Sequence, residues 1–169
     1  MTFQFTCTSC GEIHSGMPAF SAEAPLSYYA LPEAERGVRC ELGSDDCVID
    51  GELFFVRGCI EVPVHGENEP FSWGVWVSLS RASYEKWCAV FSVEKRDHVG
   101  PFFGWLNASL KLYPTGESIK TRVHLRNNGI RPYLELEPTD FLLAVEQREG
   151  IPRERAAEIY EAMVHGHEN

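Results

Sequence analysis

The chain has 169 residues, 44% of them hydrophobic and 24% charged, which is the composition of a globular protein that can bury a core without disulfides. Its formal net charge of −10 argues against a nucleic-acid phosphate backbone or an anionic membrane as the partner. No apolar run approaches the roughly 20 residues that cross a bilayer, and Met1 to Phe5 lack the pattern of a signal peptide. We therefore expect a cytoplasmic protein whose six cysteines are reduced.

The first chemical motif is a pair of closely spaced cysteines. The segment Cys7–Gly11 reads CTSCG, and C-x-x-C-G is typical of half a zinc knuckle, because two thiolates lie on one turn that the glycine lets bend round the metal. His14 follows four residues after Cys10. The chain has no second C-x-x-C, so a redox dithiol and a chance pair of thiols stay open as alternatives.

A tetrahedral zinc site needs two further ligands. Cys47 is the first choice, because it begins a predicted strand among polar residues, and His14 is the second, with Cys40 in reserve. Cys59 and Cys88 occupy apolar patterns and are interpreted as structural. The predicted structural zinc site consists of Cys7, Cys10, Cys47 and His14.

The stretch 45–80 is predicted to form a meander of strands. Asp50 and Gly51 favour a type I′ hairpin, which needs positive φ at both central positions, and 66–70 supplies a longer turn. Apolar residues alternate with others from Phe71 to Leu79, as in a strand with one buried face. Five residues are expected to lie mostly in the core: Trp73, Val75, Phe91, Trp105 and Leu136.

The remaining elements follow from capping and periodicity. A helix over 83–94 carries an apolar stripe and has Ser80 or Ser83 as its cap, and 121–137 reads as a pair of strands. Two helices follow, the first ending at Gly150 and the second opening at Pro152. His165 and His167 are close enough together to bind metal, but chain ends are commonly disordered, so they are assigned to a frayed polar end.

Together these elements predict an α+β fold. An antiparallel sheet forms its centre, with helices packed on one face and a C-terminal helical segment. We expect one domain over 1–169, made of a knuckle and loop region (1–44), a sheet with an inserted helix (45–137) and C-terminal helices (138–169).

Several sequence blocks occur in an order that resembles a known bacterial family. They are CTSCGEIH (7–14), DDCVIDGELFFVRG (45–58), WGVWVSLS (73–80), FGWL (103–106), RPYLELEPTD (131–140) and EQREGI (146–151). The chain resembles, from about Phe5 to Tyr160, the uncharacterised proteins grouped as domain of unknown function 2199. The resemblance implies a small stand-alone bacterial protein and draws attention to the four predicted zinc ligands. The chain departs from the family pattern at Phe141 and Leu142, where the family has histidine and proline, and in the turn at 113–116.

No enzyme motif accompanies the cysteines. The sequence has no G-x-S-x-G elbow, phosphate-binding glycine loop, H-E-x-x-H or paired-carboxylate motif. We therefore expect a non-enzymatic, zinc-stabilised protein that acts through contacts with another protein, whose identity stays open, as does the oligomeric state. The alternatives are an acidic immunity-type protein that neutralises a basic toxin, and a zinc-dependent enzyme that uses the Cys7 and Cys10 site.

Overall fold

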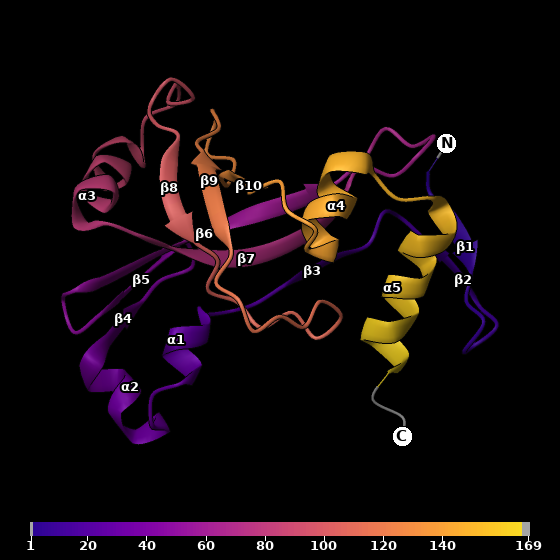
Figure 1. The fold of residues 1–169 in the computed structure, drawn as a ribbon, viewed down its shortest axis with the longest axis horizontal. Helices are drawn as coiled ribbons and strands as arrows, with labels where there is room; N and C mark the ends of the chain where they lie inside the picture. Colours follow the sequence, from indigo (N-terminus) through magenta and orange to yellow (C-terminus); the bar gives the residue numbers. More distant parts are fainter. Residues whose placement is uncertain (1, 167–169) are drawn as a thin grey trace. The chain divides into compact units, whose positions relative to one another are not determined.

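The computed structural model describes residues 2–166, which contain five helices and ten strands (Figure 1). The strands are β1 (Gln4–Thr6), β2 (Ile13–Ser15), β3 (Ala19–Ser21), β4 (Cys40–Leu42), β5 (Asp46–Ile49), β6 (Leu53–Val62), β7 (Phe71–Leu79), β8 (Phe102–Trp105), β9 (Lys120–His124) and β10 (Tyr133–Leu136). The helices are α1 (Leu26–Tyr29), α2 (Glu33–Arg39), α3 (Arg81–Val90), α4 (Leu142–Glu149) and α5 (Arg153–His165). The fold class is therefore α+β, and none of the helices described is long and apolar enough to cross a membrane.

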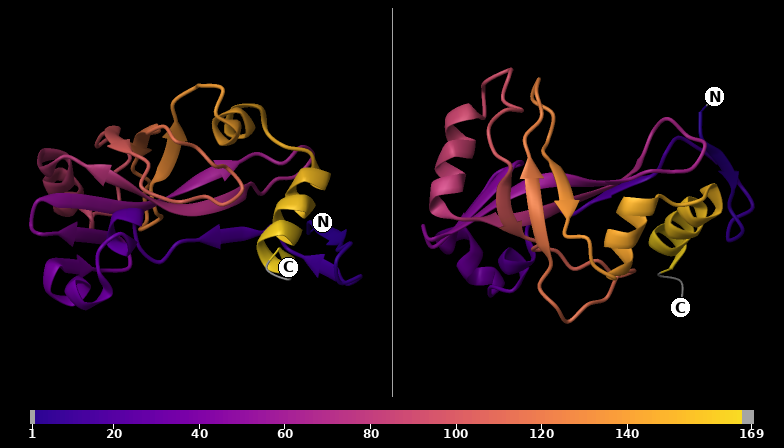
Figure 2. Two further views of the ribbon diagram at one scale, coloured as in Figure 1. Left: turned by 60° about the horizontal axis from the view of Figure 1, so that its bottom comes forward. Right: turned by 45° about the horizontal axis from the view of Figure 1, so that its top comes forward.

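The strands form two sheets. β1 and β2 make a separate antiparallel pair, and the larger sheet runs in the order β3-β7-β6-β10-β9-β8, with β5 on β6 and β4 on β5. β8, β9 and β10 lie side by side in antiparallel pairs (Figure 2). However, β10 pairs with β6 in parallel, with Tyr133 opposite Cys59, so the prediction of a purely antiparallel sheet is wrong. The long connection between β6 and β10, which includes α3, is what allows a parallel neighbour.

The predicted hairpin turn between β5 and β6 is confirmed. Asp50 and Gly51 have φ values of 54° and 64°, and the N–H of Glu52 donates to the carbonyl of Ile49 at 3.0 Å. Arg39 braces the turn from the end of α2, donating to the two carboxylate oxygens of Asp50 at 2.9 and 2.7 Å. This pair holds the pKa of Asp50 below its ordinary value.

The sequence predicts that helices pack on one face of the sheet, but in the second unit they lie on both faces of β6. Consecutive strand residues point to opposite faces, and Phe54 and Phe55 are neighbours in β6. Phe54 stacks on Tyr84 of α3 at 4.7 Å, whereas Phe55 belongs to a buried cluster on which Tyr28 of α1 and Leu31 pack. The segment around α1 and α3 therefore lie on opposite faces of β6.

The core predictions are confirmed for three of five residues. Trp73, Val75 and Leu136 are buried. The prediction is wrong for Phe91 and Trp105, which are 45% and 40% exposed. In β8 the buried positions are Phe102 and Gly104, so the strand's alternation turns Phe103 and Trp105 outward.

The described residues group into two compact units. The first comprises 2–20, 61–72 and 138–166, and the second comprises 21–60 and 73–137. The first contains the β1–β2 pair with α4 and α5, and the second contains α1, α2 and α3. The single domain over 1–169 stays a prediction.

Candidate metal centre

A short hairpin in the first unit presents the two cysteines of the C-x-x-C motif. β1 and β2 pair in register, with Phe5 opposite His14. The N–H of Cys7 donates to the carbonyl of Glu12 at 2.8 Å, and the N–H of Gly11 donates to the carbonyl of Cys7 at 2.9 Å. Gly11 has a φ of 76°, a conformation that glycine adopts without strain. The local sequence therefore folds into the predicted tight turn, with both thiols on it.

Four side chains with metal-binding atoms meet beside this turn. Cys7, Cys10, His14 and His165 each offer one ligand atom, and these atoms all lie within 4.8 Å of one another. The sulfur of Cys10 lies 3.4 Å from Nε2 of His14. A tetrahedral zinc, with bonds of about 2.3 Å to sulfur and 2.0 Å to nitrogen, separates two such atoms by about 3.5 Å. The group could therefore close round one ion through shifts of at most about 1.5 Å.

His165 supplies the sharpest indication of a ligand. It is the last residue of α5, and its Nε2 atom is buried with no hydrogen-bond partner among residues 2–166. A buried polar atom left without a partner costs about 1–3 kcal/mol, so such atoms are rare in folded proteins. A metal ion held between His165 and its three neighbours would satisfy this nitrogen.

His14 is oriented by an aromatic residue of α5. Its Nδ1 atom lies 3.3 Å from the phenol oxygen of Tyr160, and the two rings are 4.7 Å apart. Phe5 contacts both rings, at 5.5 Å from His14 and 5.2 Å from Tyr160. When Nδ1 carries the proton and donates it to Tyr160, the lone pair of Nε2 faces Cys10, as metal ligation requires.

Glu161 fixes the knuckle to the same helix. Its two carboxylate oxygens accept hydrogen bonds from the backbone N–H and the hydroxyl of Thr8, at 2.6 and 2.7 Å. These bonds lower the pKa of Glu161, so the carboxylate is ionised at neutral pH. Because Tyr160, Glu161 and His165 all belong to α5, one helix supplies a side chain with a metal-binding atom and two supporting contacts.

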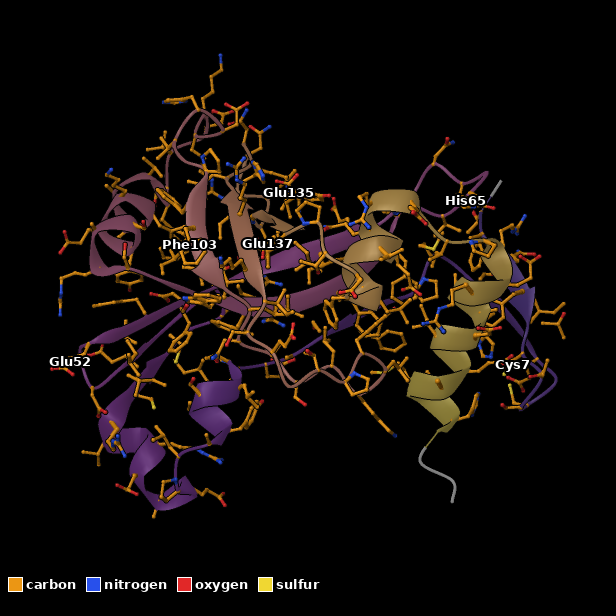
Figure 3. The ribbon with its side chains drawn as sticks, viewed as in Figure 1. Cys7, Glu52, His65, Phe103, Glu135 and Glu137 are labelled. Atoms are coloured by element: carbon orange, nitrogen blue, oxygen red, sulfur yellow. The ribbon has the colours of Figure 1, made fainter. Side chains whose placement is uncertain are left out.

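The thiol of Cys10 is affected by its neighbours in two directions. The backbone N–H of Glu12 lowers its pKa, whereas desolvation and the nearby Cys7 thiol raise it, and the net pKa lies above the ordinary value. Cys7 is buried and Cys10 is exposed, and Cys7 is labelled in Figure 3.

The structure brings together three of the four predicted ligands, Cys7, Cys10 and His14. Cys47, the fourth, is not in the group: it is buried in an apolar cluster with Ile49, Phe55 and Trp76, on which Cys40 packs. Burial raises the pKa of Cys47 to about 12, with smaller contributions from Cys40 and Asp46. A thiol in these surroundings is a small apolar side chain.

Sequence reasoning assigned His165 to a frayed end, but α5 continues through this residue. The available signal was helical spacing, because His165 lies one turn after Glu161 on a helix whose other side carries the buried residues Ala156 and Ile159. His167 lies outside the described residues.

Comparison with known proteins identifies a family to which the chain is similar. No curated protein and no solved structure matches the chain. Residues 6–151 match the family described as an uncharacterised protein conserved in bacteria (DUF2199), a range that includes Cys7, Cys10 and His14 and ends before His165. Since this range covers most of the 169 residues, the chain belongs to the DUF2199 family of bacterial proteins.

Proposed function

We propose that the protein is a non-enzymatic bacterial protein of the cytoplasm, stabilised by one structural zinc ion. Its ligands are the thiolates of Cys7 and Cys10 and the imidazoles of His14 and His165. The observation that carries the proposal is the buried, unpartnered Nε2 of His165 beside three other ligand atoms. Two sulfurs and two nitrogens are the donor set of many structural zinc sites, whereas calcium and magnesium prefer oxygen ligands.

The number of ligands favours a structural role over a catalytic one. A catalytic zinc keeps one coordination position open for water or substrate, whereas four protein ligands close a tetrahedral site. All four come from the same group of side chains here, so a zinc held by them has no position left for chemistry. The alternative of a zinc-dependent enzyme at Cys7 and Cys10 requires one of the histidines to leave the metal.

The zinc would join two segments that are far apart in the sequence. Cys7, Cys10 and His14 belong to the hairpin near the start of the chain, and His165 ends α5. The hydrogen bonds between Thr8 and Glu161 already connect the same segments. Metal binding that closes such a connection contributes directly to the free energy of folding.

The protein would act through contacts with another protein. Phe103, labelled in Figure 3, and Trp105 project from β8 with 52% and 40% of their surface exposed, and their rings meet edge to face at 5.2 Å. Exposed aromatic side chains of this kind are enriched among the residues that carry binding energy in protein interfaces. They support this part of the proposal without identifying the partner.

The test of the site is metal content in variants with matched controls. The chain is purified under reducing conditions without chelator, and any histidine tag is removed. Cys7→Ser and His165→Gln are compared with Cys88→Ser and His98→Gln, which alter an exposed cysteine and an exposed histidine of the second unit. Zinc is measured by elemental analysis, and cobalt is bound in its place so that its visible spectrum reports tetrahedral thiolate coordination.

We expect about one zinc per chain in the wild type and both controls, and weaker binding in both site variants. Loss of His165 should also change the cobalt spectrum, because one nitrogen ligand is replaced. Substoichiometric zinc that Cys7→Ser leaves unchanged would remove the site. Unaltered zinc affinity and an unaltered cobalt spectrum in His165→Gln would show that this histidine is not a ligand and that another group fills the fourth coordination position.

A further inference from the structure

The second unit contains a pocket that the proposed zinc site does not use. Its volume is about 230 Å³, and it is lined by residues that include Asp45, Arg57, Trp87, Phe91, Arg96 and Arg131. Trp87 and Phe91 come from α3 and its C-terminal cap, and their rings are 4.9 Å apart. Two aromatic rings therefore form an apolar side of the pocket, and three arginines belong to the rest of its lining.

The charge of this lining is opposite to that of the whole chain. Three arginines and one carboxylate, Asp45, line the pocket, whereas the chain carries a net charge of −10. Asp45 is already engaged by Arg131, whose Nε lies 3.1 Å from its carboxylate. Arg57 and Arg96 are only 6% and 4% exposed. The guanidinium groups of Arg57 and Arg96 are thus buried, and the single carboxylate of the pocket lining is paired with the third arginine, Arg131.

Among the residues that the structure describes, 2–166, Arg96 is held by neutral groups alone. Its Nη1, Nε and Nη2 atoms donate to the backbone carbonyls of Phe91, Arg126 and Ile130, at 2.6, 2.8 and 3.1 Å. These bonds fix the loops that form the pocket wall, but none of them supplies a negative charge. A buried charge without a counter-charge is costly, because carbonyl dipoles replace only part of its hydration.

Arg57 is also incompletely compensated. Its Nη1 and Nη2 donate to the carbonyl of Ser44 and the hydroxyl of Ser21 at 3.3 and 3.1 Å, and its guanidinium lies 5.8 Å from the ring of Trp76. Its ion-pair partner, Glu23, is 4.0 Å away and largely exposed to solvent. The Nε atom of Arg57 is buried and has no partner within the part of the chain described, residues 2–166.

We propose that this pocket binds a small oxyanion, a carboxylate or phosphate group carried on a compact apolar body. Guanidinium groups pair with such oxyanions through short, charge-assisted hydrogen bonds, and a bound anion would supply the missing counter-charge. The rings of Trp87 and Phe91 provide a surface for the apolar part. The pocket volume of about 230 Å³ has room for a compact ligand of the size of benzoate or phenyl phosphate.

The test uses these compounds as probes on the full-length, zinc-loaded chain. Binding of benzoate, phenyl phosphate and inorganic phosphate is measured by titration calorimetry and by the shift in thermal unfolding, with benzylamine as the cationic control. The informative variant is Ser92→Asp, because Ser92 lines the pocket and is exposed, so the substitution adds a negative charge without disturbing a buried side chain. Ser92→Asn is the matched control, and Arg131→Gln removes one of the guanidinium groups.

We expect saturable binding of at least one anion and none of benzylamine. Ser92→Asp should weaken anion binding by about tenfold or more through repulsion, while Ser92→Asn leaves it nearly unchanged. Preference for benzoate assigns the pocket to carboxylates, and preference for the phosphates assigns it to phosphoryl groups. The proposal is overturned by absent binding of all three anions, by equal binding of benzylamine, or by anion binding that both Ser92→Asp and Arg131→Gln leave unaltered.

Discussion

The phenol oxygen of Tyr160 lies 3.3 Å from Nδ1 of His14, the ring nitrogen that does not face Cys10. This contact links α5 to the hairpin and leaves Nε2 of His14 free to bind a metal. The same helix places His165 beside the two cysteines. The geometry of the proposed zinc site thus depends on a contact that is itself not a ligand bond.

Tyr160→Phe should weaken zinc binding without unfolding the protein. The substitution removes the hydroxyl that orients His14 but keeps the ring that packs on Phe5 and His14. Loss of such a supporting hydrogen bond typically lowers metal affinity by about 10–100-fold. Competition with a chelator measures the affinity, and Tyr29→Phe, at an exposed tyrosine of α1, is the control. Equal zinc affinity in the two variants would show that Tyr160 does not orient the ligand.

Removing zinc should loosen the two joined segments before the rest of the protein. Hydrogen exchange of the chelated protein is expected to quicken in β1, β2 and the last turn of α5, because the proposed zinc would connect them. Exchange in the second unit, for example in Trp73–Leu79 of β7, should be unaffected. Uniform acceleration along the whole chain would contradict a local role for the ion.

Two tryptophans should differ sharply in their contribution to stability. Trp73 is 3% exposed and meets Tyr113 edge to face at 5.8 Å, whereas Trp105 is 40% exposed. Truncating Trp73 to alanine should cost about 3–5 kcal/mol, and truncating Trp105 about 1–2 kcal/mol. Denaturant titration of both variants measures these losses in the free energy of unfolding. Similar losses would show that burial does not distinguish the two positions.

Two glycines with open space around them should respond in opposite directions to alanine. Gly51 has a φ of 64°, whereas Gly37 lies inside α2 with no positive φ, and an added Cβ would meet nothing within 4 Å at either site. Gly51→Ala should destabilise the protein by about 1–2 kcal/mol, because L-residues are strained in this conformation. Gly37→Ala should stabilise it by about 0.5–1 kcal/mol. Denaturant titration decides, and a stabilised Gly51→Ala would be incompatible with the turn described.

Cys47 should resist alkylation while Cys88 reacts. Burial raises the pKa of Cys47 to about 12, so at pH 8 only about one molecule in ten thousand carries the reactive thiolate there. Because the folded-state pKa is raised, the buried neutral thiol favours folding below the unfolded-state value of about 9, and this contribution declines as pH rises from about 9 toward 12. Mass spectrometry after a timed iodoacetamide pulse at pH 8 compares the two cysteines. Labelling of Cys47 as fast as of exposed Cys88 would contradict its placement in the core.

Local sequence was sufficient wherever neighbouring residues alone determine a conformation. The knuckle turn at Gly11 and the hairpin at Asp50 and Gly51 were predicted because each requires a particular backbone dihedral that few residues adopt. The end of α4 at Gly150, whose φ is 77°, follows the same rule. The start of α3 is also local, because the hydroxyl of Ser80 accepts a hydrogen bond from the N–H of Ser83 at 3.1 Å. The proximity of Cys7 and Cys10 belongs to this class, since two residues three positions apart on one tight turn stay close together.

Only the tertiary structure decided which distant segments meet. Nothing in the sequence near Tyr133 specifies a parallel partner. However, β10 lies parallel to β6, which is possible because the long connection between them brings the chain back to the end of the sheet where β6 begins. The alternation of residues in β8 indicates two faces but not which of them is buried, so the prediction that Trp105 lies in the core is wrong. The same dependence on distant contacts explains why Cys47 was predicted as a ligand and His165 was not. Strand pairing encloses Cys47 among apolar side chains, whereas the packing of α5 on the hairpin brings His165 close to the thiols of Cys7 and Cys10. Which ligands share a site depends on contacts between elements, and these follow from the burial of surfaces that are separated along the chain.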